Sequence, residues 1–413
     1  MHILFVSRWF PYPPDNGSRI RVFNLVKQLS RRHEITLLSF TQRPISNEHL
    51  AEMATYCRSV RTVPYRVFNP NRLKALLGFL STRPRSIVDT ESREMRALVE
   101  TAHIDNCFDV VVASEIESTP YALLLNRTPR VFEEVELAVI HEQVAHQHSL
   151  ISRFRYRLTW WKLSRFVAQL LHEFDGCTVV SKQERNLVKK IHPGYDALAI
   201  VPNGVDLEAN TGDFGAPKPD TLIYPGALTY SANFDAMEFF LQDIFPLVKA
   251  QHPTASLRIT GRYDGVPVER LSLGNGAELT GYLDDIRPSV AQSWGCVVPL
   301  RVGGGTRLKV LEAMALGTPV ISTSKGAEGL EVTHEENILI ADDPGDFAQA
   351  VLRLLGDEDL RARLSANGRR LVEEQYSWET CARQLERLLD QLVMQSGGTR
   401  GGSTETGFEG MIS

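Results

Sequence analysis

Short apolar runs alternate with amphipathic segments along most of the chain, and this alternation predicts an α/β fold. The first run, residues 2–7, is followed by a turn-rich loop and then by residues 18–31, whose apolar positions recur at helical spacing. Strands that alternate with helices form parallel sheets covered by helices. Further strands are expected at 34–40, 60–63, 110–113, 130–132, 176–180 and 200–201, with helices at 92–103 and 182–191.

A second alternation of the same kind begins after residues 207–220, which are polar and rich in glycine and proline. Its strands are expected at 221–225, 255–260, 277–280, 295–299 and 319–322, and its helices at 233–250, 284–292, 345–355 and 358–374. We therefore predict doubly wound domains at 1–206 and 221–376 with a linker at 207–220. A last helix is expected at 377–394, and a tail at 395–413 is expected to be disordered because it lacks apolar residues.

Length and composition narrow the class of protein and its possible partners. The 413 residues suffice for two domains, and 43% apolar with 23% charged residues is typical of a soluble globular protein. The net charge of −5 argues against a nucleic-acid partner. Five scattered cysteines predict reduced thiols instead of a disulfide framework or a zinc site. No apolar leader or ~20-residue membrane span is found, so we expect a cytoplasmic protein, with the inner face of the cell membrane as an alternative location.

The stretch Pro299–Pro319 combines the end of a strand, a glycine loop and a helix expected at about 307–316. Glycines at 303–305 let a ligand approach the backbone, and the start of a helix presents N–H groups to an anion. Arg307 and Lys309 fall in the first turn, where the helix dipole disfavours cations unless a bound phosphate is present. The alternative is an ordinary glycine turn with two solvated basic side chains.

Two loops are expected at the carboxyl ends of strands, where open α/β sheets bind their ligands. The glycine loop follows the strand at 295–299, and the segment WFPYPPDNGSR follows the first strand. If the two domains face each other, both loops line one cleft.

Several stretches together resemble retaining glycosyltransferases of family 4. The donor-site signature is matched by PLRVGGGTRLKVLEAMALGTPVI, the end of the first domain by VVSKQERNLV and VPNGVD, and the last helix by YSWETCARQLERLL. Near the start, PPDNGSRIR is similar to the P-P-x-x-G-x-x-x-R pattern of bacterial enzymes of polysaccharide assembly. The resemblance implies a GT-B fold: two Rossmann-like domains facing across a cleft, with the C-terminal helix crossing back to the first domain.

The resemblance also implies the chemistry. A sugar would move from a nucleotide-sugar substrate, without a metal or other cofactor and without a protein nucleophile, because the leaving phosphate helps to deprotonate the acceptor. Glu312 would hold the ribose hydroxyls, and Arg307 and Lys309 would neutralise the diphosphate as catalytic groups. The remaining donor contacts implied are Gly17, Gly281, Tyr282, Gly303, Gly304, Gly305 and Thr306. Asn16 and Arg21 are candidates for a phosphate or an acidic acceptor, although Arg21 is equally compatible with a solvated surface position.

Two positions depart from the family pattern. Gly304 stands where the family has a glutamate that contacts the transferred sugar. Val135 stands where a first-domain histidine is often found, between Glu134 and Glu136. Either glutamate could polarise an acceptor hydroxyl, although such clusters are more often solvated. Nearby histidines, at positions 141, 146 and 148, are more often structural than ligand-binding.

Two segments are basic and rich in apolar residues, residues 65–87 and 151–166. Such segments can lie on an anionic membrane surface, which would suit a lipid-linked acceptor. The alternative for 151–166 is an ordinary amphipathic helix with its aromatic side chains in the core.

The leading hypothesis is a hexosyltransferase that extends a glycan or a lipid-linked acceptor in polysaccharide or cell-surface glycan biosynthesis. Its partners would be a nucleotide-sugar, the acceptor and an anionic membrane surface. One alternative is a non-catalytic sugar-nucleotide-binding partner in an assembly complex, for which Gly304 argues. A weaker alternative is a nucleotide-sugar 2-epimerase.

Overall fold

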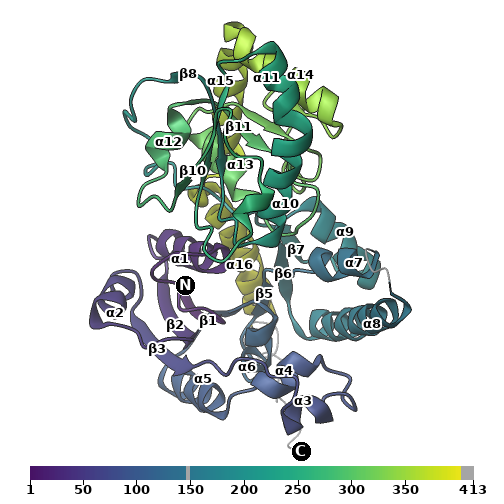
Figure 1. Ribbon diagram of the computed structural model, residues 1–413. Helices are drawn as coiled ribbons and strands as arrows, with labels where there is room; N and C mark the ends of the chain where they lie inside the picture. The colour runs from purple at the N-terminus through teal and green to yellow at the C-terminus, as the bar shows by residue number, and fades with distance from the viewer. Residues whose placement is uncertain (146–148, 401–413) are drawn as a thin grey trace, which may run out of the picture. The chain divides into compact units, whose positions relative to one another are not determined.

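The computed structural model describes residues 1–145 and 149–400, which divide into two compact units. The first unit comprises Met1–Pro202 together with the C-terminal segment from Cys381, and the second comprises Asn203–Thr380. Each unit contains one parallel sheet with helices packed around it (Figure 1). The predicted α/β architecture with two Rossmann-like sheets is confirmed.

The first unit has a sheet in the order β3-β2-β1-β4-β5-β6-β7. Its strands are β1 (His2–Ser7), β2 (Glu34–Thr41), β3 (Ser59–Pro64), β4 (Val110–Ser114), β5 (Arg130–Glu133), β6 (Gly176–Val179) and β7 (Leu198–Ile200). Phe5 lies opposite Leu37 on one side and Val112 on the other. These side chains are buried because helices cover the sheet, so β1 has a continuous apolar run instead of an alternating pattern.

The helices of the first unit start at clear capping signals. Asn16 caps the first helix by accepting a hydrogen bond from the backbone N–H of Arg19, and Ser181 accepts one from Glu184 at the start of α9. The helices are α1 (Gly17–Leu29), α2 (Asn47–Ala54), α3 (Leu73–Leu77), α4 (Arg85–Thr90), α5 (Arg93–Asp105), α6 (Thr119–Ala122), α7 (Ala138–Ala145), α8 (Leu150–Glu173) and α9 (Lys182–Ile191), with a 3₁₀ turn η1 (Ile116–Ser118).

The second unit has a sheet in the order β10-β9-β8-β11-β12-β13. Its strands are β8 (Lys218–Pro225), β9 (Ser256–Thr260), β10 (Ala277–Gly281), β11 (Ser293–Val298), β12 (Val320–Ser322) and β13 (Leu339–Ile340). Its helices are α10 (Ser231–Phe239), α11 (Phe245–Gln251), α12 (Arg287–Ala291), α13 (Leu308–Ala315), α14 (Pro344–Gly356) and α15 (Glu358–Gln375), with a short turn η3 (Val268–Arg270).

The single helix predicted at 233–250 is interrupted in the structure. A π-helical turn, η2 (Phe240–Ile244), separates α10 from α11. Pro246 stands at the start of α11, where it has no N–H for the carbonyl group one turn earlier. The wider turn therefore accommodates the proline without ending the helical path.

The C-terminal helix α16 (Trp378–Arg400) returns to the first unit, as predicted. Glu386 accepts hydrogen bonds from Arg32 and contacts the ring of His33. A Cβ atom on Gly176 of β6 would lie 2.8 Å from the side chain of Leu392, so this glycine allows the helix to approach the sheet closely. Helical residues 395–400 correct the prediction that the disordered tail begins at 395, and residues 401–413 lie outside the described part.

The segment predicted as a linker, residues 207–220, is partly built into the second unit. Lys218 already starts β8, because its N–H donates to the carbonyl of Gln292. Val205 donates to the carbonyl of Tyr376, so the second unit starts at Asn203 instead of after the predicted linker. Across the described residues, no helix combines the length and hydropathy that crossing a bilayer requires.

Candidate functional site

Both sheets reverse their strand order at one point, and ligands of open α/β sheets bind at the carboxyl ends of the strands there. In the second unit the reversal lies between β8 and β11, so the loops after Pro225 and Val298 meet at that edge. In the first unit it lies between β1 and β4, where the segments after Ser7 and Ser114 meet.

The glycine loop after β11 packs against the residues that follow β8. Gly303 and Gly305 have φ angles of 106° and 83°, which side chains with a Cβ rarely adopt. A Cβ atom on Gly303 would lie 3.0 Å from Cβ of Ala232 and 3.3 Å from the hydroxyl of Tyr230. Glycine is therefore required at this position for both conformation and space.

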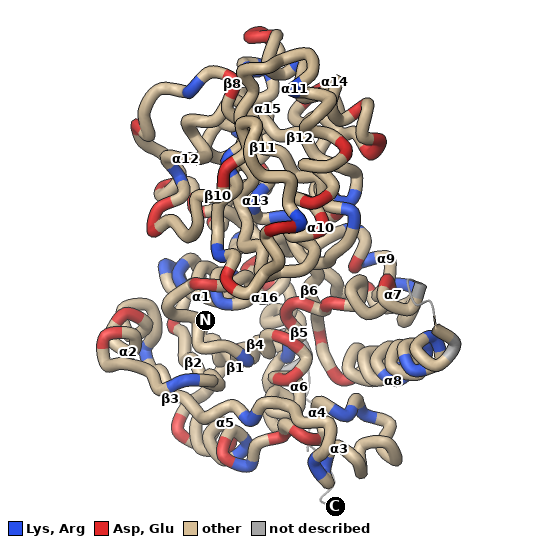
Figure 2. Tube along the Cα trace, viewed as in Figure 1, with Lys and Arg blue, Asp and Glu red and all other residues tan. Residues whose placement is uncertain are grey.

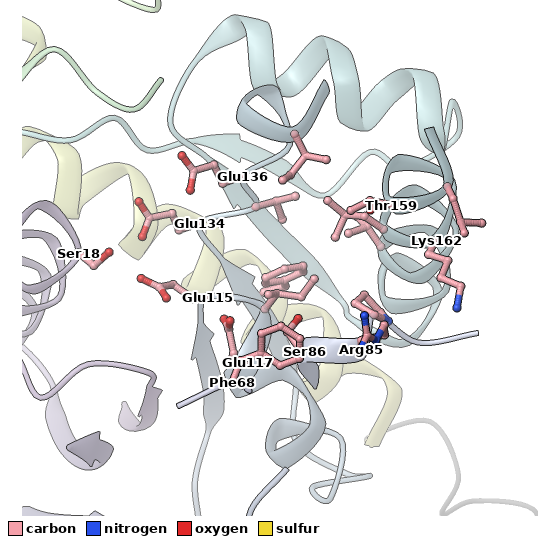
Figure 3. A pocket seen from close by; sticks show the side chains of 18 of the residues that line it. Ser18, Phe68, Arg85, Ser86, Glu115, Glu117, Glu134, Glu136, Thr159 and Lys162 are labelled. Carbon is pink, nitrogen blue, oxygen red and sulfur yellow. The ribbon is translucent and has the colours of Figure 1, made fainter. Parts of the chain in front are cut away.

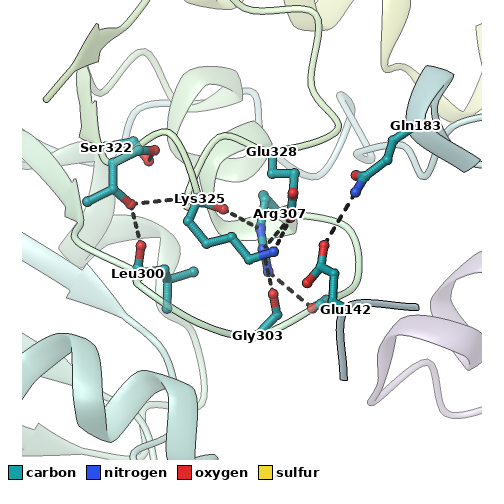
Figure 4. Close-up of polar contacts among 11 residues, drawn as sticks. Glu142, Gln183, Leu300, Gly303, Arg307, Ser322, Lys325 and Glu328 are labelled. Atoms are coloured by element: carbon teal, nitrogen blue, oxygen red, sulfur yellow. Dashed lines mark hydrogen bonds and ion pairs between the residues drawn. The ribbon is translucent and has the colours of Figure 1, made fainter. Parts of the chain in front are cut away.

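Arg307 lies beneath this loop, with only 5% of its surface exposed. Its guanidinium group donates to the carbonyl oxygens of Gly303 (2.9 Å), Gly304 (3.1 Å) and Lys325 (3.1 Å) and lies 3.4 Å from the carboxylate of Glu328 (Figure 4). The interpretation of Arg307 as a solvated side chain is wrong, because the side chain is buried. A contact of its guanidinium group with a ligand diphosphate stays a prediction, and Arg307 has a structural role. It fixes the course of the loop, because carbonyl groups that point inward accept from it.

Lys309 is half-buried on the first turn of α13. Its ammonium group donates to the hydroxyl of Tyr224 and to Oδ1 of Asn233, each at 2.9 Å. Burial lowers the pKa of Lys309 to about 8. A Cβ atom on Gly226 would lie 2.8 Å from Nζ, so the glycine makes room for the ammonium group.

Glu312 lies one turn after Lys309 on the same face of α13. Burial raises its pKa, and the nearby charge of Lys309 opposes that shift. Among the described residues the structure gives the carboxylate no hydrogen-bond partner. A half-buried cation and a half-buried carboxylate next to a glycine loop can together bind an anion and a pair of hydroxyl groups.

The other donor candidates of the second unit lie around this site and at the sheet edge. The hydroxyl of Thr306 accepts a hydrogen bond from Asn203 at 2.6 Å, which ties the PNGVD segment to the glycine loop. Gly281, with φ of 73°, ends the edge strand β10. Tyr282 after it is 63% exposed, with the guanidinium of Arg262 at 5.3 Å from its ring centroid. This exposed aromatic ring is suited to stacking.

The first unit contains a pocket of about 620 Å³ that opens beside its own point of strand reversal. Carboxylates of Glu115, Glu117, Glu134 and Glu136 gather at one end near Ser18, while Arg85 and Lys162 lie at the other end (Figure 3). The wall between the two ends is mostly apolar and includes Phe68, Phe79, Phe132, Val135, Leu158 and Leu163.

The glutamates at the acidic end follow β4 and β5. Glu115 and Glu134 both have φ of 63°, a left-handed conformation that non-glycine residues rarely adopt. Burial, with the neighbouring charge of Glu117, raises the pKa of Glu115 to about 7, and burial raises that of Glu134 well above its usual range. The indole N–H of Trp9 donates to Glu115 at 3.2 Å. Such carboxyl groups change protonation near neutral pH and can bind hydroxyl groups.

Arg21 contacts two glutamates next to this pocket and holds them in position. Its side chain is fully buried, donates to Oε1 of Glu133 at 2.7 Å and lies 3.6 Å from Oε2 of Glu134. The sequence-based interpretations of Arg21, as a ligand contact or as a solvated side chain, are therefore both corrected. Arginine at this position holds the glutamates in place.

Sequence reasoning missed Ser18, Glu115 and Glu117, which line this pocket, and Arg8, whose charge acts on Glu115. The guanidinium of Arg8 lies 3.6 Å from the ring centroid of Tyr65 and 4.2 Å from that of Trp9. The signal that could have identified Arg8 and Glu115 is their position directly after β1 and β4. Strand order is needed to use that signal, because it shows which two strand ends are neighbours.

The other candidates of the first unit are placed as follows. Asn16 caps α1, and Gly17 is exposed with no heavy atom within 4 Å of a Cβ built on it. His141 packs against the ring of Trp160 and lines a different groove, of about 420 Å³. His146 and His148 lie outside the described residues. Within the described part of the chain, no three His, Cys, Asp or Glu side chains are grouped as a metal site.

Comparison with protein families gives two matches that together span most of the chain. Residues 15–209 match the model described as Glycosyltransferase Family 4, and residues 219–357 match Glycosyl transferases group 1. A 44.6 kDa protein encoded in the cps region of Klebsiella pneumoniae is 21% identical over 91% of this chain and 96% of its own length. A GDP-mannose-dependent monoacylated alpha-(1-6)-phosphatidylinositol monomannoside mannosyltransferase from Corynebacterium glutamicum is 26% identical over 52% of this chain and 62% of its own.

Solved structures show the same fold at low sequence identity. Sucrose-phosphate synthase from Thermosynechococcus elongatus superposes with a TM-score of 0.66 and 18% sequence identity. The match covers 96% of this chain and 100% of the synthase chain. The Anabaena protein Alr3699/HepE in complex with UDP superposes with a TM-score of 0.66 and 14% sequence identity. The match covers 95% of this chain and 100% of the Anabaena chain.

Proposed function

We propose that this chain, which belongs to glycosyltransferase family 4 and has the GT-B fold, transfers a sugar from a nucleotide-sugar to a glycan or lipid-linked acceptor with retention of configuration. The relative encoded in a cps region supports a role in polysaccharide assembly. The Corynebacterium mannosyltransferase, which is named for a glycolipid acceptor, supports a lipid-linked one. The Anabaena structures with UDP and with UDP-glucose support a nucleotide-sugar donor.

The observation that carries the proposal is the half-buried pair Lys309 and Glu312 on α13, the helix that follows the glycine loop. Lys309 and the backbone N–H groups of the loop bind the donor diphosphate, and Glu312 accepts hydrogen bonds from the two ribose hydroxyls. Arg307 positions the loop. The exposed ring of Tyr282 stacks on the base.

In the proposed transfer one bond breaks and another forms, and groups of the site stabilise the charge that develops. The bond between the anomeric carbon and the diphosphate oxygen breaks, and the negative charge that develops on the oxygen is stabilised by Lys309. The acceptor hydroxyl attacks the anomeric carbon from the same face, and its proton passes to the departing phosphate. At Gly304, where the family has a glutamate, a backbone N–H takes over the contact with the transferred sugar.

We assign the acceptor to the pocket of the first unit. Glu115, Glu134 and Glu136 accept hydrogen bonds from acceptor hydroxyls and orient the one that reacts. Arg21 keeps Glu134 in place. The apolar wall accommodates a less polar part of the acceptor.

Calorimetry with UDP and GDP tests the donor site. We expect Lys309→Met and Glu312→Gln each to weaken binding of the preferred nucleotide at least tenfold. Arg301→Gln is the matched control, because Arg301 belongs to the same loop region but is exposed and paired with Asp235. Wild-type affinity in both site variants would refute the assignment.

Gly304 also favours a second candidate function, a partner protein that binds a sugar nucleotide without transferring the sugar. The two functions differ in nucleotide release. A transferase releases nucleoside diphosphate from its donor, slowly into water and faster with acceptor, whereas a binding partner releases none. Recovery of an epimerised nucleotide-sugar would instead indicate the 2-epimerase.

A further inference from the structure

Large apolar side chains are exposed on two segments of the first unit, around α3 and in the first half of α8. Leu80 is 89% exposed, Leu73 73%, Ile151 83% and Phe154 71%. Trp161 is also more than half exposed. Single exposed apolar residues are common, but a contiguous group of this size usually marks an interaction site. We call residues 66–85 and 151–165 together the α3–α8 surface.

Hydrogen bonds and a shared cavity join the two segments into one surface. The ammonium group of Lys162 on α8 donates to the carbonyl oxygens of Phe79 and Ser81, each at 3.1 Å. Phe79 and Leu158, which belong to different segments, line the same pocket. The turn after α3 is therefore held against α8, so its leucines project as part of one surface.

The charge of this surface is entirely positive, although the whole chain has a net charge of −5. Neither segment contains an aspartate or glutamate, and each contains five basic residues; blue segments on α8 and beside α3 and α4 mark these in Figure 2. Arg72, Arg85 and Lys162 are engaged in internal contacts. The outer cations on α8 are Arg153, Arg155, Arg157 and Arg165.

The alternative in which α8 only packs its aromatic residues into the core accounts for part of the helix. Phe166 and Val167 are buried in this way, but Phe154 and Trp161 are not. The half of α8 that carries three closely spaced arginines is thus also the half that leaves its apolar side chains in water.

The combination of positive charge and exposed apolar side chains indicates which class of partner fits the α3–α8 surface. In a symmetric dimer through this surface, the outer arginines of one copy would face the outer arginines of the other, which is strongly unfavourable. A nucleic acid would contact the arginines but would leave Leu73, Leu80 and Ile151 without a partner, because these side chains cannot stack on bases. An anionic lipid bilayer offers phosphates at the level of the arginines and acyl chains below them.

We propose that the α3–α8 surface docks on an anionic lipid bilayer, with its leucine, isoleucine and phenylalanine side chains inserted between the headgroups. This proposal goes beyond the proposed function and does not depend on it. If both hold, the pocket wall formed by Phe79 and Leu158 lies at the membrane, where an acceptor with a lipid tail would be found.

Flotation of the full chain with vesicles of phosphatidylglycerol in an excess of phosphatidylcholine tests the proposal. We expect the wild type to float with these vesicles and not with pure phosphatidylcholine, and to be released by high salt. The apolar variant Leu80→Ser with Phe154→Ser and the charge variant Arg153→Gln with Arg157→Gln should each reduce the bound fraction at least fivefold. None of these residues lines the pocket.

Matched control variants distinguish an effect of the α3–α8 surface from a general effect of removing exposed apolar or charged side chains. Ile104→Ser removes an apolar side chain that is 84% exposed on α5, and Arg31→Gln with Arg61→Gln removes two exposed cations outside the surface. Both controls should float like the wild type. Equal flotation of patch and control variants would overturn the proposal, as would failure of the wild type to float. A dimer in solution that the apolar variant disrupts, or oligonucleotide binding that only the charge variant disrupts, would also overturn it.

Discussion

At the scale of single residues, the candidate site of the second unit is defined by two half-buried charged groups. Lys309 is held by Tyr224 and Asn233, and burial lowers its pKa to about 8. Glu312, one turn along, is half-buried without a hydrogen-bond partner among the described residues, and its pKa is raised. A bound donor with a diphosphate and vicinal hydroxyls would satisfy both groups, so the free site is electrostatically prepared for its ligand.

Lys309→Met should therefore stabilise the protein while abolishing donor binding. The pKa of Lys309 is lower in the folded chain than its ordinary value, so its charge opposes folding below pH 8, and this cost disappears between about pH 8 and pH 10.5. We expect the variant to be more stable at neutral pH by roughly 1–3 kcal/mol, with a smaller difference at pH 10. Denaturant unfolding at both pH values measures this, and a less stable variant at pH 7 would contradict it.

Glu115→Gln should change the pH dependence of transfer. Burial and the charge of Glu117 raise the pKa of Glu115 to about 7, so the carboxylate forms as pH rises from 6 to 8. If the ionised group accepts a hydrogen bond from the acceptor, kcat/KM for the acceptor rises over this range in the wild type and loses that rise in the variant, with a loss of about tenfold or more at pH 8.

Glu94→Gln is the control for this measurement, because it removes an exposed carboxylate of α5 in the same unit. Its pH profile should equal that of the wild type. A profile of the Glu115 variant that keeps the wild-type rise would remove Glu115 from the acceptor site.

At the scale of elements, apolar periodicity predicted most helices and strands, because burial in an α/β fold follows directly from it. The glycine loop between β11 and α13 was predicted correctly, but the direction of the Arg307 side chain was not. Spacing places a residue on a turn; it does not show whether a guanidinium meets solvent or the carbonyl groups of the preceding loop. Glu115 was missed for a similar reason, since its neighbours come from strands far apart in sequence.

The C-terminal helix shows what an element contributes to stability. Leu389 on α16 is fully buried, and the helix packs on the sheet of the first unit. We expect Leu389→Ala to lower the free energy of unfolding by about 2–4 kcal/mol, because a cavity remains in the packed core. Met394→Ala, at an exposed position of the same helix, should change it by less than about 0.5 kcal/mol. A loss of similar size in both variants, measured by denaturant unfolding, would argue against the packing of α16.

At the scale of the whole molecule, each unit has its chemistry where its sheet reverses strand order. The second unit carries the glycine loop, Lys309 and Glu312 at the ends of β8 and β11, and the first carries Arg8 and Glu115 at the ends of β1 and β4. The two-sheet architecture and the glycine loop between β11 and α13 were accessible from sequence. Strand order, the acidic pocket and the exposure of the α3–α8 surface were not, because they depend on contacts between distant segments.

A crystal structure of the protein with its preferred nucleoside diphosphate tests the central claim most directly. We predict phosphate oxygens within hydrogen-bond distance of Nζ of Lys309 and of backbone N–H groups in the glycine loop, with the ribose hydroxyls on the carboxylate of Glu312. A diphosphate bound elsewhere, or a nucleotide turned so that its ribose is remote from Glu312, would contradict the account.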